Sequence, residues 1–189
     1  MNLRPTLLAV LLLALCGSTL AATDEAQSPV DVHVKKNGEL IIIDVDFKVP
    51  VAPKQAWEVL TDFDHMSNFV SNVKFSAITK RDGDKIEVTQ KGLADHGLIS
   101  FAFDSVREIE LKPFSKITSH ILSGNMKKLD GTTVLTPDGN GTHVVYHAES
   151  ISPTYVPPVI GPKFIEGESR HQFEEMRAEM LKRKATSEK

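Results

Sequence analysis

The sequence predicts an α+β domain in which an antiparallel sheet packs against one long C-terminal helix. Two observations support this fold class. Short stretches of alternating apolar and polar residues, separated by turn sequences, follow one another from about residue 31 to 151. Residues 162–184 then form a long stretch with helical periodicity. The alternating stretches correspond to about six or seven strands, and the terminal helix is the only predicted element long enough to cover their apolar face.

The N-terminus has the features of a secretory signal peptide. Arg4 precedes a short apolar run that cannot cross a bilayer, and small residues surround a cleavage site after Ala21. The protein is therefore expected to be periplasmic or secreted. A lipoprotein signal ending at Cys16 is the alternative, although the large Leu15 is unfavourable before such a cysteine.

Cleavage after Ala21 has consequences for composition and charge. It removes Cys16, the only cysteine, and so excludes disulfides, thiolate catalysis and cysteine metal ligands. It also removes Arg4 and no acid, which changes the formal net charge from −3 to −4 and gives no indication of nucleic-acid binding. The expected organisation is a signal peptide at 1–21, a flexible segment at 22–30, one domain at 31–185 and a tail at 186–189.

The first two strands are predicted to form a hairpin. Val32 and Val34 alternate with polar residues, and Asn37-Gly38 follows, the dipeptide that most readily forms a two-residue hairpin turn. The next strand places a set of apolar residues on one face. They are Ile41, Ile43, Val45, Phe47 and Val49.

Two short helices are expected after this hairpin. Pro53 can open the first, whose buried side carries Trp57, Leu60 and Phe63. Asp64 can cap the second, which runs to about Phe69.

From residue 73 to 151 the pattern is strand and turn repeated. The stretch at 98–111 is too long for one flat strand, so a bend is expected there. The predicted strands lie at 73–80, 85–93, 98–111, 116–123, 128–136 and 142–151.

The terminal helix carries a stripe of residues at three- and four-residue spacing. They are Ile165, Ser169, Phe173, Met176 and Met180. A serine and flexible methionines in place of leucines suit the wall of a cavity. The alternative is an ordinary core helix whose methionines fill gaps.

Alternation assigns one face of each strand to the side of this helix. Polar residues on that face are informative, because an apolar chamber with a few converging polar groups is the usual composition of a small-molecule site. They are Gln90, Ser105, Arg107, Ser119, Thr132 and Tyr146. The alternative is that these residues lie at strand ends near solvent.

Arg107 is the most informative of these residues. An unpaired guanidinium is very unfavourable to bury, so an inward Arg107 needs a carboxylate such as Glu87, a position at the rim, or a ligand oxygen.

No catalytic residue, metal site or cofactor is predicted. His143 and His147 share a strand face but lie roughly 13 Å apart, too far to share a metal ion. His96, beside Asp95, is a candidate general base, whereas a solvated loop histidine is the ordinary interpretation.

The order and spacing of several short motifs resemble the START-like (SRPBCC, helix-grip) superfamily, and within it the polyketide cyclase and coenzyme-Q-binding branch. The motifs are Val49-Pro50-Val51-Ala52-Pro53, residues 56–63, Asn72-Val73, Gly124-Asn125-Met126, Gly131-Thr132-Thr133, Gly141-Thr142 and Tyr146. The resemblance covers roughly residues 40–184. It implies a curved antiparallel sheet wrapped around the terminal helix, with a deep cavity for lipids, quinones, sterols or polyketides. It also implies that Gly131 and Gly141 permit turns or close approach.

The expected function is that of an exported, monomeric binding or carrier protein for a lipid, quinone or other isoprenoid. The Pro-rich segment from Tyr155 to Ile160 is a candidate for transient contact with a membrane. The alternative is that its apolar residues pack against the end of the sheet. One alternative is a cyclase or aromatase that acts on a polyketide-like substrate, in which Arg107 and Tyr146 polarise a carbonyl and His96 or a cavity acid moves a proton. Another is a filled core and a protein that acts by surface contacts. The predicted ligand-binding residues are Gln90, Phe101, Phe103, Arg107, Ser119, Thr132, Tyr146, Ile165, Ser169, Phe173 and Met176.

Overall fold

The computed structural model describes residues 29–96 and 99–188, so the predicted signal peptide lies outside the described residues. The chain forms one antiparallel sheet of eight strands in the order β1-β2-β8-β7-β6-β5-β4-β3. Each of the stretches predicted as a strand is present, so the predicted total of six or seven was too low. The strands are β1 (Asp31–Asn37), β2 (Leu40–Val49), β3 (Val73–Asp82), β4 (Lys85–His96), β5 (Ile99–Lys112), β6 (Lys116–Gly124), β7 (Lys128–Asp138) and β8 (Gly141–Ile151).

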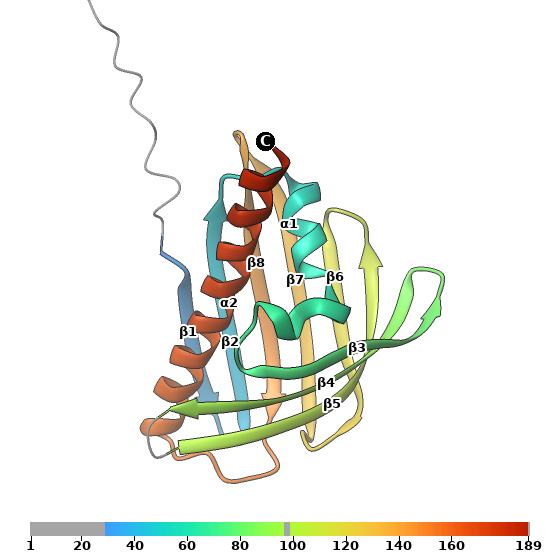
Figure 1. Cartoon of the computed structure of the whole chain (residues 1–189). Helices are drawn as coiled ribbons and strands as arrows, with labels where there is room; N and C mark the ends of the chain where they lie inside the picture. Colours follow the sequence, from blue (N-terminus) through green and yellow to red (C-terminus); the bar gives the residue numbers. More distant parts are fainter. Residues whose placement is uncertain (1–28, 97–98, 189) are drawn as a thin grey trace, which may run out of the picture.

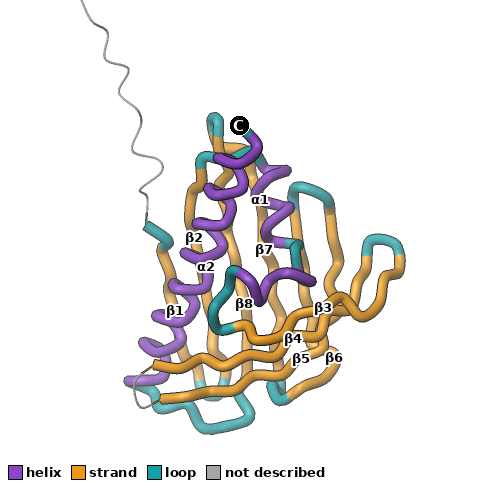
Figure 2. The backbone as a smooth tube through the Cα atoms, in the orientation of Figure 1, coloured by secondary structure: helices purple, strands orange, loops and turns teal. Residues whose placement is uncertain are grey.

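The helices lie on one side of this sheet. The long helix α2 (Ile160–Ser187) runs alongside β1 and β2, and α1 (Pro53–Leu60) and the 3-10 helix η2 (Phe63–Asn68) lie beside its C-terminal half (Figure 1). The sheet bends so strongly that β3, β4 and β5 run across the direction of β1 and β2 (Figure 2). The predicted α+β class and helix-grip arrangement are therefore confirmed.

Local sequence explains the main boundaries. Gly38 has a φ of 61° in the predicted Asn37-Gly38 turn, a conformation that glycine adopts without steric strain. The predicted bend in the long strand is present as a register shift between β5 and β6 at Val106 and Arg107. Helix α2 begins at Ile160, before the predicted Pro162, because the amide of Gly161 already donates to the carbonyl of Pro157 (2.9 Å).

The core forms where α1, η2 and the C-terminal half of α2 meet the sheet. Phe173, Met176 and Met180 of the predicted stripe are buried, and Phe173 contacts the ring of Phe47 with centroids 6.0 Å apart. Arg183 Nη2 donates to Asp62 Oδ2 (2.8 Å), which ties the end of α2 to the segment after α1. This end of the sheet is therefore closed by packed side chains.

The strand-face prediction was wrong for β7. Thr132 was predicted to face the helix, but Gly131, Thr133 and Leu135 are the buried residues and Val134 is 39% exposed. Adjacent Val134 and Leu135 make both faces apolar, so polarity alone does not determine the orientation. The pairing of β7 with β8 determines the orientation, since Thr133 lies opposite the inward-facing Tyr146 and paired residues share a face.

The N-terminal strand is anchored to α2. Val30, at the end of the segment predicted to be flexible, is only 1% exposed, and Arg170 of α2 donates to its carbonyl oxygen.

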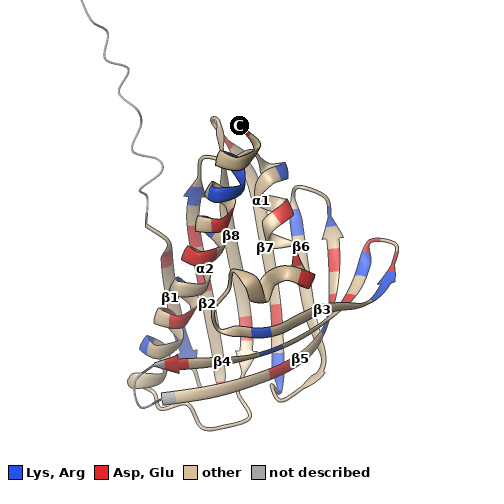
Figure 3. Cartoon of the chain, in the orientation of Figure 1, with Lys and Arg blue, Asp and Glu red and all other residues tan. Residues whose placement is uncertain are grey.

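Figure 3 shows basic and acidic residues interspersed along α2 and the strands. No helix within 29–96 or 99–188 is both long and apolar enough to span a membrane.

Two glycines provide a test of this packing. A Cβ at Gly141 would lie 2.6 Å from the carbonyl oxygen of Val49, whereas a Cβ at Gly167 in α2 meets nothing within 4 Å. We expect Gly141→Ala to lower the free energy of unfolding by about 1–3 kcal/mol. Gly167→Ala, the matched control, should raise it by about 0.5–1 kcal/mol, because alanine is the better helix former. Urea denaturation of both variants measures these changes, and a neutral Gly141→Ala would contradict the close approach.

Candidate functional site

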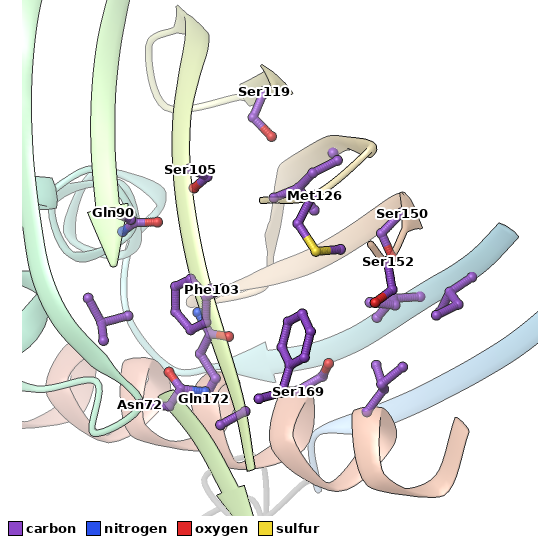
Figure 4. Close-up of a pocket in the computed structure, with 18 of the residues that line it drawn as sticks. Asn72, Gln90, Phe103, Ser105, Ser119, Met126, Ser150, Ser152, Ser169 and Gln172 are labelled. Atoms are coloured by element: carbon purple, nitrogen blue, oxygen red, sulfur yellow. The ribbon is translucent and has the colours of Figure 1, made fainter. Parts of the chain in front are cut away.

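A cavity of about 550 Å³ lies between the sheet and α2. Its walls come from β2 to β8, from α1 and η2, from the segment after β8, and from the first half of α2. Figure 4 shows its labelled polar side chains projecting from several of these elements toward the same space. The volume lies within the range of small-molecule sites, and the alternative of a completely filled core is wrong.

The structure brings ten of the eleven predicted ligand-binding residues into this cavity wall. They are Gln90, Phe101, Phe103, Arg107, Ser119, Tyr146, Ile165, Ser169, Phe173 and Met176. Thr132 is the exception, because it projects from the opposite face of β7, and Thr133 lines the cavity in its place. That these residues bind a ligand stays a prediction.

Several polar residues of the lining were missed by the sequence analysis. Ser150 has the same parity on β8 as the inward Tyr146, so strand periodicity could have found it. Gln172 flanks the apolar stripe of α2. Asn72 precedes β3 and has no such signal, and its Oδ1 atom is buried without a hydrogen-bond partner.

A chain of hydrogen bonds fixes Gln90 at the closed end of the cavity. Its Nε2 donates to Ser76 Oγ (3.0 Å) and contacts Met66 Sδ (3.1 Å) in η2. These contacts leave its Oε1 facing Arg107, whose Nη2 donates to it. The side chain of Gln90 therefore orients the guanidinium without neutralising its charge.

Arg107 has no acidic partner within the described part of the chain. Glu87, the carboxylate expected to pair with it, instead binds Lys80 (3.1 Å), because Val88 and not Glu87 lies opposite Arg107 in the sheet. The Nε of Arg107 is buried without a hydrogen-bond partner. Burial lowers the pKa of the Arg107 guanidinium, although arginine stays protonated in proteins. The cavity thus contains a charged donor with unused hydrogen-bonding capacity.

Tyr146 lies near this guanidinium. Its ring packs against Phe173 with centroids 5.2 Å apart. Burial raises the pKa of its hydroxyl, and the positive charge of Arg107 opposes that rise. A Cβ at Gly131 would lie 3.1 Å from both the Tyr146 hydroxyl and Ser119 Oγ, so glycine leaves room for both groups beside the cavity.

The other end of the cavity is bordered by the segment between β8 and α2. Tyr155 and Val156 of this segment and Ile160 of α2 line it. Tyr155 is 79% exposed, Val159 73% and Ile160 57%. Large side chains at this end of the cavity are therefore in contact with solvent, and we take this end as the entrance.

His143 and His147 lie away from the cavity. His143 binds Asp46 (2.8 Å) and His147 binds Asp44 (2.6 Å), both on the outer face of the sheet. The described residues contain no group of three or more potential metal ligands. The side chain of His96 lies outside the part of the chain that the structure describes.

The sequence matches the family model described as "Polyketide cyclase / dehydrase and lipid transport" over residues 41–181. The chain belongs to this family. The matched region extends from β2 to α2 and includes every residue that lines the cavity. The predicted START-like, polyketide cyclase-type relationship is therefore confirmed. A search of curated proteins found no match.

Solved structures share this fold at low sequence identity. The STAR-related lipid transfer protein from Xanthomonas axonopodis has a TM-score of 0.67 and 13% identity over 80% of this chain and 93% of that chain. The Zhui aromatase/cyclase from Streptomyces sp. R1128 has a TM-score of 0.63 and 14% identity, with coverages of 76% and 95%. The lipid transfer and protein localization domain of human StarD13 has a TM-score of 0.60 and 14% identity, with coverages of 81% and 85%. At such identities these structures establish the fold alone.

The buried charge of Arg107 predicts an unusual effect on stability. Arg107→Met removes a desolvated cation, which is unfavourable by several kcal/mol, at the loss of a hydrogen bond to Gln90 worth about 1 kcal/mol. We expect the ligand-free variant to unfold at a temperature equal to or above that of the wild type. Thermal denaturation followed by circular dichroism measures this.

Arg81→Met, which removes an exposed arginine, is the matched control and should leave the unfolding temperature unchanged. If Arg107→Met lowers the free energy of unfolding by more than about 2 kcal/mol, the guanidinium stabilises the ligand-free fold, and the expectation is contradicted.

Proposed function

We propose that the protein is an exported, monomeric carrier that holds a hydrophobic small molecule, such as a lipid, quinone or other isoprenoid, in the cavity between the sheet and α2. The observation that carries this proposal is the cavity of about 550 Å³ with mostly apolar walls. The family description names lipid transport, and lipid transfer domains share the fold. Export is inferred from the signal-peptide pattern of residues 1–21.

The apolar walls provide the binding energy in this proposal. Each CH₂ group that leaves water for an apolar site contributes about 0.8 kcal/mol, so a long hydrocarbon chain binds without many specific polar contacts. Phe101 and Phe103 of β5 and Phe164 of α2 supply rings to the wall. Flexible Met126 and Met176 adapt to ligands of different shape.

Loading takes place at a membrane surface in this proposal. Tyr155, Val159 and Ile160 are exposed beside the entrance, so a bilayer can cover them while a lipid passes between membrane and cavity. Aromatic residues such as Tyr155 suit the interface between headgroups and hydrocarbon.

A cyclase or aromatase acting in the same cavity is the second candidate. The placement of Arg107 and Tyr146 in one cavity favours it, because together they can hold and polarise a carbonyl group. An aromatase/cyclase shares the fold. Cyclisation also needs a group that transfers a proton, and Tyr146 is the lining residue among those described whose chemistry suits this role.

The first experiment is native mass spectrometry with organic extraction of the protein purified from its own compartment. A carrier should retain a lipid or quinone at close to one molecule per chain, and extraction identifies it. An empty protein that turns over polyketide-like substrates would instead support the cyclase. Recovery of the protein from the cytoplasm, with residues 1–21 still attached, would contradict export.

A second experiment tests the membrane contact. Val159 is exposed beside the entrance but does not line the cavity, so Val159→Asp should slow transfer of a bound fluorescent lipid to vesicles by up to about tenfold and leave the affinity in solution unchanged. Leu122→Asp, at an exposed apolar position of β6 away from the lining, is the matched control. Equal transfer rates in both variants would argue against contact through this segment.

A further inference from the structure

Arg107 is the one charged residue among the described residues that line the cavity. The polar groups around it, including Gln90, Ser105, Ser119 and Tyr146, are uncharged side chains. A buried charge is expected to have a compensating partner, and the described chain supplies none. The partner that balances the charge therefore has to come from the bound molecule.

The position of Arg107 determines which end of that molecule it meets. Its guanidinium binds Gln90, which contacts Met66 of η2, the helix that closes the cavity. Tyr146, close to Arg107, packs on Phe173, which lies thirteen residues after Ile160 and so about 20 Å along α2 from the entrance. A group that binds Arg107 therefore lies deep inside, and the rest of the ligand extends toward the entrance.

The hydrogen-bonding state of Arg107 limits the chemistry of that group. One nitrogen is used by Gln90, and the Nε donor is unused. A carboxylate matches an arginine in charge and accepts two parallel hydrogen bonds. A neutral carbonyl or hydroxyl would leave the positive charge unbalanced, and a phosphate monoester carries about −1.5 to −2 charge, more than one guanidinium neutralises.

We infer that the ligand is an amphipathic monocarboxylic acid, such as a fatty acid or an isoprenoid acid, which binds with its carboxylate on Arg107 and its hydrocarbon chain directed toward the entrance. This inference rests on the proposed carrier function and specifies the ligand class for the same cavity. Gln90 acts as a positioning residue, since its bonds to Ser76 and Met66 hold the carbonyl oxygen that orients the guanidinium.

The test compares ligands that differ only in the head group. Protein stripped of lipid is titrated in a calorimeter with palmitic acid, methyl palmitate and cetyl alcohol at neutral pH. The wild type should bind palmitic acid about ten- to a hundredfold more tightly than the other two, the usual gain from charge-assisted hydrogen bonds. Arg107→Met should bind all three with similar affinity. Arg107→Lys, which keeps the charge but loses the planar fork, should retain part of the preference.

The outcomes separate the inference from the proposed function. If the wild type binds the acid, ester and alcohol equally well, or if Arg107→Met keeps the preference for the acid, the inference is overturned while the carrier function stands. If none of the three binds to the stripped protein, the inference is overturned, and the carrier function is overturned with it unless extraction recovers another hydrophobic ligand. Arg81→Met removes an arginine that is largely exposed and does not line the cavity, so this variant should behave as the wild type.

Discussion

The cavity depends on one geometric constraint: a single helix has to cover the concave side of a strongly bent eight-stranded sheet. Close packing is reached only where α1 and η2 add their side chains to those of α2, around Phe63, Met66, Phe173 and Met180. Toward the start of α2 no second layer of helices is present among the described residues, and the residue of α2 that faces the space there is the small Ser169. The result is a domain whose one end is a packed core and whose other end is a chamber.

The polar groups next to Arg107 are held by neighbouring strands. Gln90, Ser105 and Arg107 project from the adjacent strands β4 and β5, whose register is fixed along their whole length. Ser76 of β3 and Met66 of η2 complete the surroundings of Gln90. A site built on paired strands is already arranged before a ligand arrives, so little conformational entropy is lost on binding. The entrance has the opposite character, since Tyr155 and Val159 are largely exposed.

The extent to which sequence predicts this site differs from strand to strand. On β5, the apolar Phe101, Phe103 and Ile109 share one face, and the two-residue period of a strand places Arg107 on that face as well. On β7 the run Thr132-Thr133-Val134-Leu135 has similar polarity on both faces. A shift of one residue in the strand register would exchange the inward and outward faces without changing their polarity. The correct face follows from the pairing of Thr133 with Tyr146, which is a long-range property.

The sequence by itself determined the elements, their order, the Asn37-Gly38 turn and the stripe of α2, because these depend on local periodicity and local backbone preferences. It also identified Arg107 as a residue that requires a partner. Only the tertiary structure decided that Glu87 is not that partner, because the two side chains project from opposite faces of paired strands. It likewise decided that space remains beside the guanidinium, since an empty volume depends on how distant segments pack and leaves no pattern in the chain.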